Sequence, residues 1–113
     1  MGYGLGMQAV TADLFKALAD PTRRAIFEWI ARDGEQTVHG LTRRAGVSQP
    51  AVSKHLAVLK LARLVRDRRD GRETHYSAQP RALVPLVDWV SHYGVFWRDR
   101  LDRLESLLNK IEK

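Results

Sequence analysis

The chain contains no cysteine, and this single absence removes several kinds of chemistry. Without thiols there are no disulfides, no thiolate metal ligands and no thiol redox reactions. No apolar run approaches the ~20 residues of a membrane span, and the N-terminus lacks the charged and apolar regions of a secretory signal. The sequence therefore predicts a cytoplasmic protein that needs no cofactor.

Catalytic and metal-binding motifs are lacking as well. The chain has no nucleophile elbow and no Gly-rich phosphate loop, so we do not expect an enzyme. Only Asp88 and His92 place a carboxylate and an imidazole at helical spacing, whereas a zinc site needs three or four ligands. A single pair of this kind is typical of an ordinary helix surface, so we expect no metal. The one exception would be a dimer in which two such pairs met.

Acidic residues are scarce in the middle of the chain. The protein has 113 residues, a composition typical of one folded domain, and a net charge of +6. Between residues 43 and 72, nine basic residues face only two acidic ones, while charges elsewhere nearly cancel. Positive charge concentrated in this way fits a polyanionic partner such as nucleic acid. The nine are Arg43, Arg44, Lys54, Lys60, Arg63, Arg66, Arg68, Arg69 and Arg72.

Within this basic segment, a turn leads directly into a predicted helix at about residues 48–61. Gly46 can close the preceding helix in the left-handed conformation, Ser48 is a good N-cap, and Pro50 suits the first turn. Val52, Leu56 and Leu59 form an apolar stripe that must face a core.

The polar side of this helix is suited to the DNA major groove. Gln49, Ser53 and Lys54 lie off the apolar stripe, on the exposed side of the first turns. Gln can bond bidentately to adenine, Ser to several bases, and Lys to guanine or phosphate. The pattern alone also fits an ordinary surface helix, but the surrounding positive charge favours DNA.

The elements before this helix are predicted to be helical. One helix starts at Gln8 or Thr11 and ends at Ala19, and a second runs from Asp20-Pro21 to Gly34. A short extended piece at 36–38 and a third helix at about 39–45 follow, so that the third and fourth helices form a helix-turn-helix. Residues 1–8 are predicted to be a flexible tail, and 9–113 a single domain.

A basic hairpin, the wing, is predicted at about residues 64–77. Two strand-like runs flank Asp70-Gly71, a strong hairpin turn signal. Arg68, Arg69 and Arg72 gather near its tip, where they suit phosphate or minor-groove contacts.

A long C-terminal helix is predicted at about residues 82–111. Apolar residues from Leu83 to Ile111 recur at alternating spacings of four and three, a heptad seam broken only by Gly94. A small domain cannot cover so much apolar surface alone, which predicts a homodimer. A group of aromatic residues either lines a ligand pocket between subunits or belongs to the dimer core: Trp89, Tyr93, Phe96 and Trp97.

From residue 15 to about 108 the chain resembles the ArsR/SmtB family of bacterial transcriptional repressors. The resemblance rests on LADPTRR at 18–24, GVSQPAVSKHL at 46–56, and Asp70-Gly71-Arg72 with Tyr76. It implies a mainly α fold with a small β-hairpin, a winged helix-turn-helix with a long C-terminal dimerisation helix. The usual Cys-x-Cys metal motif is absent, since residues 37–39 are Thr-Val-His.

The resemblance also implies a homodimer that binds a palindromic operator in double-stranded DNA, with no effector identified. His55 either contacts DNA or packs at the inner edge of its helix. The DNA-contact candidates are Ser48, Gln49, Ser53, Lys54, His55, Arg43, Arg44, Arg68, Arg69 and Arg72. The dimer-interface candidates are Leu14, Leu18, Val90, Trp97, Leu101, Leu104 and Leu108.

One residue departs from the family's usual sequence, and one alternative function is left open. Arg63 occupies the position after the fourth helix where the family usually has Gly, and a left-handed Arg costs roughly 1 kcal/mol. An alternative function is a winged-helix adaptor whose basic face docks an acidic protein partner.

Overall fold

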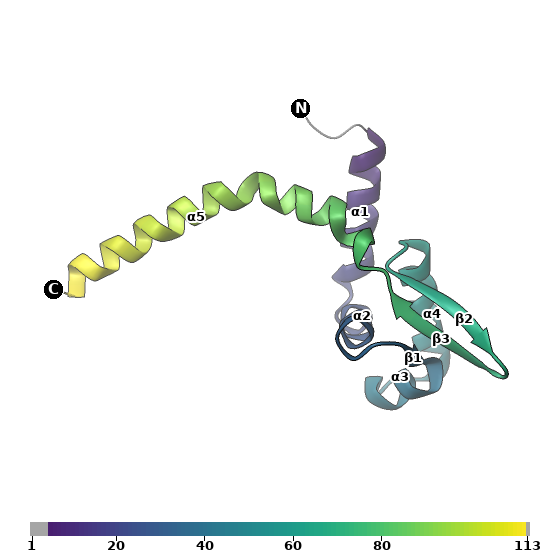
Figure 1. Cartoon of the computed structure of the whole chain (residues 1–113). Coiled ribbons are helices and arrows are strands. Elements are labelled where there is room, and N and C mark those ends of the chain that lie inside the picture. The colour runs from purple at the N-terminus through teal and green to yellow at the C-terminus, as the bar shows by residue number, and fades with distance from the viewer. Residues whose placement is uncertain (1–4, 113) are drawn as a thin grey trace.

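The computed structural model describes residues 5–112, and it has the element order of a winged helix (Figure 1). Helices α1 to α4 and a small sheet form the winged domain, from which the last helix projects. The elements are α1 (Leu5–Ala19), α2 (Pro21–Asp33), β1 (Gln36–Thr37), α3 (Val38–Ala45), α4 (Gln49–Leu61), β2 (Val65–Asp70), β3 (Glu73–Ala78), the 3-10 helix η1 (Pro80–Leu83) and α5 (Val84–Glu112).

Helix α1 begins earlier than the sequence predicted. It starts at Leu5 rather than at Gln8 or Thr11, so the backbone at 5–8 belongs to the helix and not to a tail. Leu, Met, Gln and Ala in this stretch favour helix, and they outweigh the cost of one glycine. The rest of the predicted tail, residues 1–4, lies outside the described residues.

The next three helices start at side-chain caps. The Asp20 carboxylate accepts a hydrogen bond from the N–H of Arg23 at 2.9 Å, and Ser48 Oγ accepts one from Ala51 at 3.3 Å. Both caps confirm the predicted starts, and Gly34 and Gly46 follow the ends of α2 and α3 as predicted. Thr37 caps α3 as well, and α3 therefore begins at Val38, one residue before the predicted His39.

The hydrophobic core lies between α1, α2, α3, α4 and the base of the wing. Ile26 and Ile30 of α2 are buried in it. Leu14 is only 1% exposed, because α1 turns this side chain toward the core. The prediction of Leu14 as a dimer-interface residue is therefore wrong, and Leu18 also packs against this core.

The wing is a β2–β3 hairpin, and β1 adds a short third strand on the far side of β3. Asp70 pairs with Glu73, so the two loop residues are Gly71 and Arg72, one position beyond the predicted Asp70-Gly71 turn. Gly71 has φ 64°, which suits a glycine in the first loop position of a tight hairpin. This shift places Arg72 in the turn itself.

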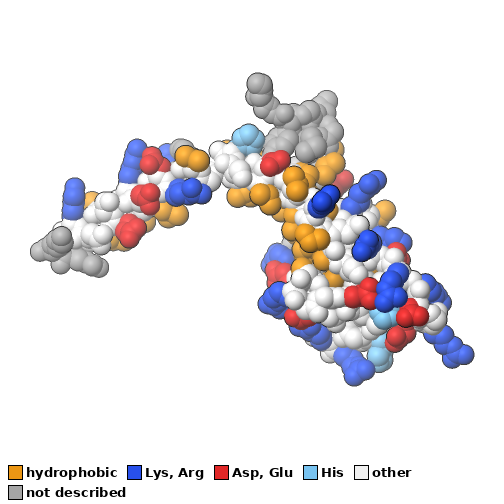
Figure 2. Space-filling model, in the orientation of Figure 1, with side chains coloured by type: hydrophobic (Ala, Val, Ile, Leu, Met, Phe, Trp, Pro, Cys, Tyr) orange, Lys and Arg blue, Asp and Glu red, His pale blue; other side chains and the backbone are white. Residues whose placement is uncertain are grey.

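Helix α5 has 29 residues and extends about 43 Å. It packs against α1 near its start, and its remainder projects away from the winged domain (Figure 1). Trp97 is 58% and Leu101 60% exposed, and Figure 2 shows hydrophobic side chains along the projecting helix. Within residues 5–112, no helix is long and apolar enough to cross a membrane.

Candidate nucleic-acid interface

Helix α4 divides into a buried side and an exposed side, as its sequence predicts. Val52, Leu56 and Leu59 are each 0% exposed. The opposite side presents Gln49, Ser53 and Lys54 to solvent, beginning at the N-cap Ser48, which is also exposed. The predicted polar contacts therefore share one accessible face.

A groove between α4 and the wing brings the two predicted DNA-contact elements together. Gln49 and Ser53 line it from α4, and Arg72 lines it from the hairpin turn. The start of α3 also contributes to its lining. The other lining residues are Thr37, Val38, His39, Glu73, Thr74 and Tyr76. Two predicted base-contact residues and one predicted phosphate-contact residue thus converge on one surface.

The wing is fastened to the recognition helix α4 by an ion pair. Lys60 Nζ lies 3.1 Å from the carboxylate of Asp67 on β2. Tyr76 is the strand partner of Asp67, and partial burial, together with the nearby Asp67 charge, raises the pKa of its phenol. The ion pair therefore links β2 of the wing to the last turn of α4.

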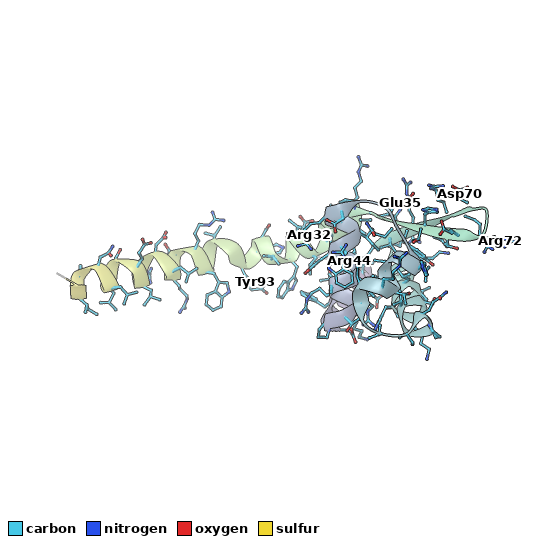
Figure 3. The ribbon with its side chains drawn as sticks, turned by 90° about the horizontal axis from the view of Figure 1, so that it is seen from below. Arg32, Glu35, Arg44, Asp70, Arg72 and Tyr93 are labelled. Carbon is cyan, nitrogen blue, oxygen red and sulfur yellow. The ribbon has the colours of Figure 1, made fainter. Side chains whose placement is uncertain are left out.

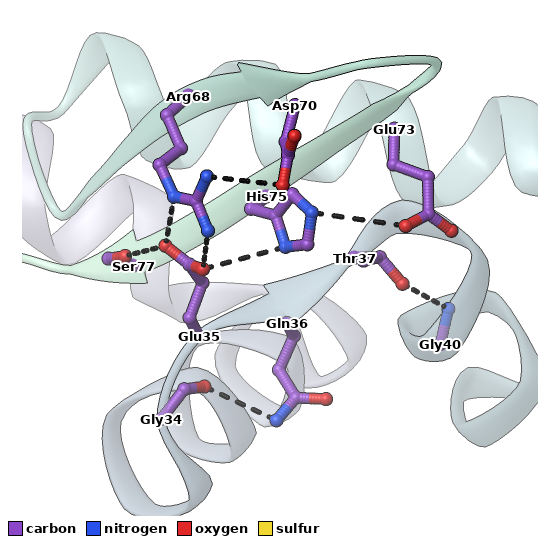
Figure 4. A network of polar contacts seen from close by, with 10 residues as sticks. All are labelled: Gly34, Glu35, Gln36, Thr37, Gly40, Arg68, Asp70, Glu73, His75 and Ser77. Atoms are coloured by element: carbon purple, nitrogen blue, oxygen red, sulfur yellow. Dashed lines mark hydrogen bonds and ion pairs between the residues drawn. The ribbon is translucent and has the colours of Figure 1, made fainter.

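The other face of the wing holds Arg68 in a polar network (Figure 4). The Nε and Nη2 atoms of Arg68 donate to the carboxylate of Glu35 at 3.0 and 2.7 Å. These bonds hold the pKa of Glu35 below its usual range and raise that of Arg68. The sequence predicts that Arg68 contacts DNA, but Glu35 already accepts two of its N–H donors and neutralises its charge.

Sequence reasoning missed Glu35, because its role depends on the strand register. Gln36 pairs with Tyr76 and Thr37 with His75, so Glu35 stands opposite Ser77 on the face that also carries Arg68. The only signal in the sequence is an acidic residue just before an extended pair.

Arg44 is also held by neighbours within the domain. Its Nη1 lies 2.7 Å from the Asp33 carboxylate, and its guanidinium lies 4.6 Å from the centre of the Trp29 ring. This hydrogen bond lowers the pKa of Asp33. Figure 3 places Arg44 on the domain body, away from Arg72 at the wing tip. Arg44 is therefore a weaker DNA-contact candidate than its exposed neighbour Arg43.

Six of the nine central basic residues form no ion pair within the described part of the chain. Their charges are available to an anionic ligand, whereas those of Arg44, Lys60 and Arg68 are matched by carboxylates. The six are Arg43, Lys54, Arg63, Arg66, Arg69 and Arg72.

His55 lies at the inner edge of α4. Its side chain is 19% exposed, with Nδ1 3.4 Å from Arg23 Nη1 and Nε2 4.0 Å from Asp20. Of the two alternatives, this position favours packing over DNA contact. Arg23 in turn donates to the carbonyl of Lys16 at 2.9 Å, so the same contacts join α1, α2 and α4.

Helix α5 carries an apolar hollow on its surface. Trp89, Val90, Tyr93 and Trp97 line it with Gly94, and Trp89 makes an edge-to-face contact with Phe15 of α1 at 5.2 Å. The predicted fourth aromatic, Phe96, has a side chain outside the described residues.

The predicted pair Asp88 and His92 lies on the exposed surface of α5. Among the side chains that the structure describes, no three His, Asp or Glu residues are grouped to hold a metal ion. The two alternatives for the aromatic residues, a ligand pocket or the dimer core, stay predictions. The expectation that the protein binds no metal also stays a prediction.

Comparison with known sequences places the chain in a family. Residues 20–67, from the Asp20 cap to the first half of the wing, match the family of bacterial regulatory proteins called arsR. The HTH-type transcriptional regulator Rv2034 of Mycobacterium tuberculosis is 51% identical over 95 residues, 84% of this chain and 85% of that protein. The transcriptional repressor SdpR of Bacillus subtilis is 32% identical over 81 residues, which are 72% of this chain and 89% of that protein.

Solved structures agree with the fold. A homodimeric winged helix-turn-helix DNA-binding domain from Mycobacterium bovis, described as a possible ArsR-family transcriptional regulator, superimposes with a TM-score of 0.65. It is 27% identical, and the match covers 82% of this chain and 91% of that one. With two relatives above 30% identity over most of their length, this chain belongs to the arsR family of bacterial regulatory proteins.

Proposed function

We propose that this protein is a homodimeric transcriptional repressor that binds a palindromic DNA operator. The observation that carries the proposal is the groove in which Gln49 and Ser53 of α4 meet Arg72 of the wing. A winged helix needs both elements on one side, because α4 enters the major groove while the wing reaches the adjacent backbone.

Each element has a distinct chemical role in the proposed complex. The exposed first turns of α4 present Gln49 and Ser53 to base edges, which carry the sequence information. Arg69 and Arg72 on the wing, with Lys54 and Arg43 near α4, neutralise phosphates and set the register of the protein on the duplex. The positive charges left without ion pairs thus lie beside the side chains that distinguish bases.

Dimerisation through α5 follows from its exposed seam. Val90, Trp97, Leu101, Leu104 and Leu108 are each at least half exposed in the single chain. A two-fold axis would bury these residues against their own copies and hold two α4 helices about one DNA turn apart, ~34 Å. The homodimeric state of the Mycobacterium bovis domain supports this arrangement.

The alternative, an adaptor that docks an acidic protein, gains nothing from the comparisons. The relatives reported above are transcriptional regulators rather than enzymes or adaptors. We therefore place the protein in the bacterial cytoplasm, where its DNA target lies.

Selection of bound duplexes from a random DNA pool tests the proposal. The purified protein should enrich an inverted repeat whose half-sites are centred one helical turn apart. Enrichment without a shared sequence would contradict a sequence-specific regulator, and an enriched single half-site would contradict the dimeric arrangement.

A further inference from the structure

The carboxylate of Glu35 is the centre of the network on the outer face of the wing (Figure 4). It accepts two hydrogen bonds from Arg68 and a third from Ser77 Oγ at 3.0 Å. His75 Nδ1 lies 3.5 Å from the same carboxylate. Both oxygens of Glu35 are thus engaged, and the bidentate geometry with Arg68 is the strongest that this pair can adopt.

This face of the wing carries two arginines, Arg66 and Arg68, and several carboxylates close to Arg68. The second guanidinium contact of Arg68 is Asp70 at 3.7 Å, and Glu73 lies 3.9 Å from His75 Nε2. Three carboxylates therefore lie around Arg68 and His75, while Arg66 lines the same hollow as Glu35. A phosphate that approached Arg68 would meet a guanidinium whose charge Glu35 already neutralises, and it would lie close to that carboxylate.

The strand register places the backbone of Glu35 beside this face of the wing. Glu35 precedes β1, whose pairing with β3 sets it opposite Ser77. From there its side chain reaches past β3 to Arg68 on β2, the outer strand of the sheet. Pairing of the three strands therefore keeps Glu35 and Arg68 within reach of each other.

We propose that Glu35 limits the affinity of this protein for DNA by keeping the Arg68 guanidinium out of contact with phosphate. The inference rests on the proposed DNA-binding function and adds a residue that tunes it. Arg69 and Arg72, whose side chains meet no carboxylate among the described residues, supply the phosphate contacts of the wing. Glu35 and Arg68 act as a neutral pair that positions the wing.

The first test measures DNA affinity of the Glu35→Gln variant over a range of salt concentrations. Glutamine keeps the shape of the side chain and can still accept from Ser77, but it no longer neutralises Arg68. We expect tighter binding to operator and unrelated duplex alike. The log–log salt slope should steepen by about 0.9, so the gain shrinks roughly 3.5-fold between 50 and 200 mM salt.

The double variant Glu35→Gln with Arg68→Ala decides the role of Arg68. It keeps the net charge of the wild type and leaves no charge of the pair behind. If the pair is neutral toward DNA, this variant binds with wild-type affinity and slope. A slope shallower by about 0.9 would show that Arg68 contacts phosphate in the wild-type complex, and would overturn the proposal.

Glu28→Gln is the matched control, because Glu28 is an exposed residue of α2 whose loss gives the same change of net charge. It should leave the salt slope unchanged. Unchanged or weaker binding by a folded Glu35→Gln variant, with folding checked by circular dichroism, would also overturn the proposal. If the wild type binds no DNA at any salt concentration, the proposed function fails instead.

Discussion

The N–H of Leu64 donates to the carbonyl oxygen of Leu59 over 2.9 Å, and this bond both closes α4 and starts the wing. A second bond, from the N–H of Arg63 to the carbonyl of Lys60 at 2.9 Å, completes a Schellman motif. Leu59 and Leu64 are both fully buried, so the motif joins α4 to the wing through the core. Arg63 occupies its left-handed position with φ 63°.

Replacement of Arg63 by glycine should stabilise the protein. Arg63 is exposed and holds a conformation that costs an L-residue about 1 kcal/mol and glycine almost nothing. Urea unfolding of Arg63→Gly should show a free energy of unfolding about 1 kcal/mol higher than that of the wild type. Gly46→Ala is the mirror-image control, because Gly46 has φ 69° and an added Cβ would meet no atom within 4 Å. It should lower stability by a similar amount, and a destabilised Arg63→Gly variant would contradict the motif.

Asp20→Asn should reduce stability in a pH-dependent way. The N–H of Arg23, helped by the nearby His55 and the Arg23 charge, holds the pKa of Asp20 below its ordinary value of 3.8. A lowered folded-state pKa stabilises the fold above the ordinary value, and the contribution disappears as pH falls through the lowered one. Urea midpoints should therefore differ between wild type and variant at pH 7 and converge below pH 3.8. A difference that grew in acid would refute this assignment.

Two charges placed on the α5 seam should separate the subunits without unfolding them. Leu101 and Leu104 are 60% and 50% exposed in the single chain, so Leu101→Glu with Leu104→Glu disturbs no core contact. In the dimer the two carboxylates would be buried without partners, at a cost of several kcal/mol. Sedimentation should show a folded monomer that no longer binds the operator.

Ser106→Glu with Asn109→Glu adds the same charge to the same part of α5, outside the seam. This control should remain dimeric. If the seam variant sediments as a dimer and still binds DNA, this stretch lies outside the interface.

DNA binding should be indifferent to transition metals. Tight Zn²⁺ sites need thiolates or several imidazoles and carboxylates in one shell, and Asp88 and His92 supply only two ligands per chain. Calorimetric titration with Zn²⁺ should reveal no sub-micromolar site. A site that His92→Ala abolishes and that releases DNA would make the protein a metal sensor.

The sequence predicts those features that depend on residues close together in the chain, such as helix caps and buried helix faces. Ser48, Pro50 and the spacing of Val52, Leu56 and Leu59 specify the start and the buried side of α4 within a few residues of chain. The same holds for the Asp20 cap and for the hairpin, although the strand register moved its turn by one residue.

What the sequence could not predict depends on contacts between distant segments. Arg68 finds Glu35, 33 positions away, only after β1 pairs with β3. Arg44 finds Asp33 and Trp29 only after α3 packs on α2. Leu14 has the same apolar character as an interface leucine, and only the packing of α1 shows that it belongs to the core.

In the proposed complex, α4 contacts the bases and the wing contacts the phosphates. Gln49 is exposed at the start of α4, where its amide can bond bidentately to one base. Arg72 lies in the hairpin turn, where it can contact phosphate without distinguishing sequence. The two residues line the same groove. Their contributions can therefore be compared by measuring the DNA affinity of one variant at each position.

The most direct measurement is the ratio of dissociation constants for the selected operator and a scrambled duplex at one salt concentration. The wild type should prefer the operator by ~10³-fold or more. Gln49→Ala should lose ~1–3 kcal/mol on the operator alone, whereas Arg72→Ala should weaken both duplexes equally. A wild-type ratio near one, or a ratio that depends on Arg72 but not on Gln49, would contradict the account.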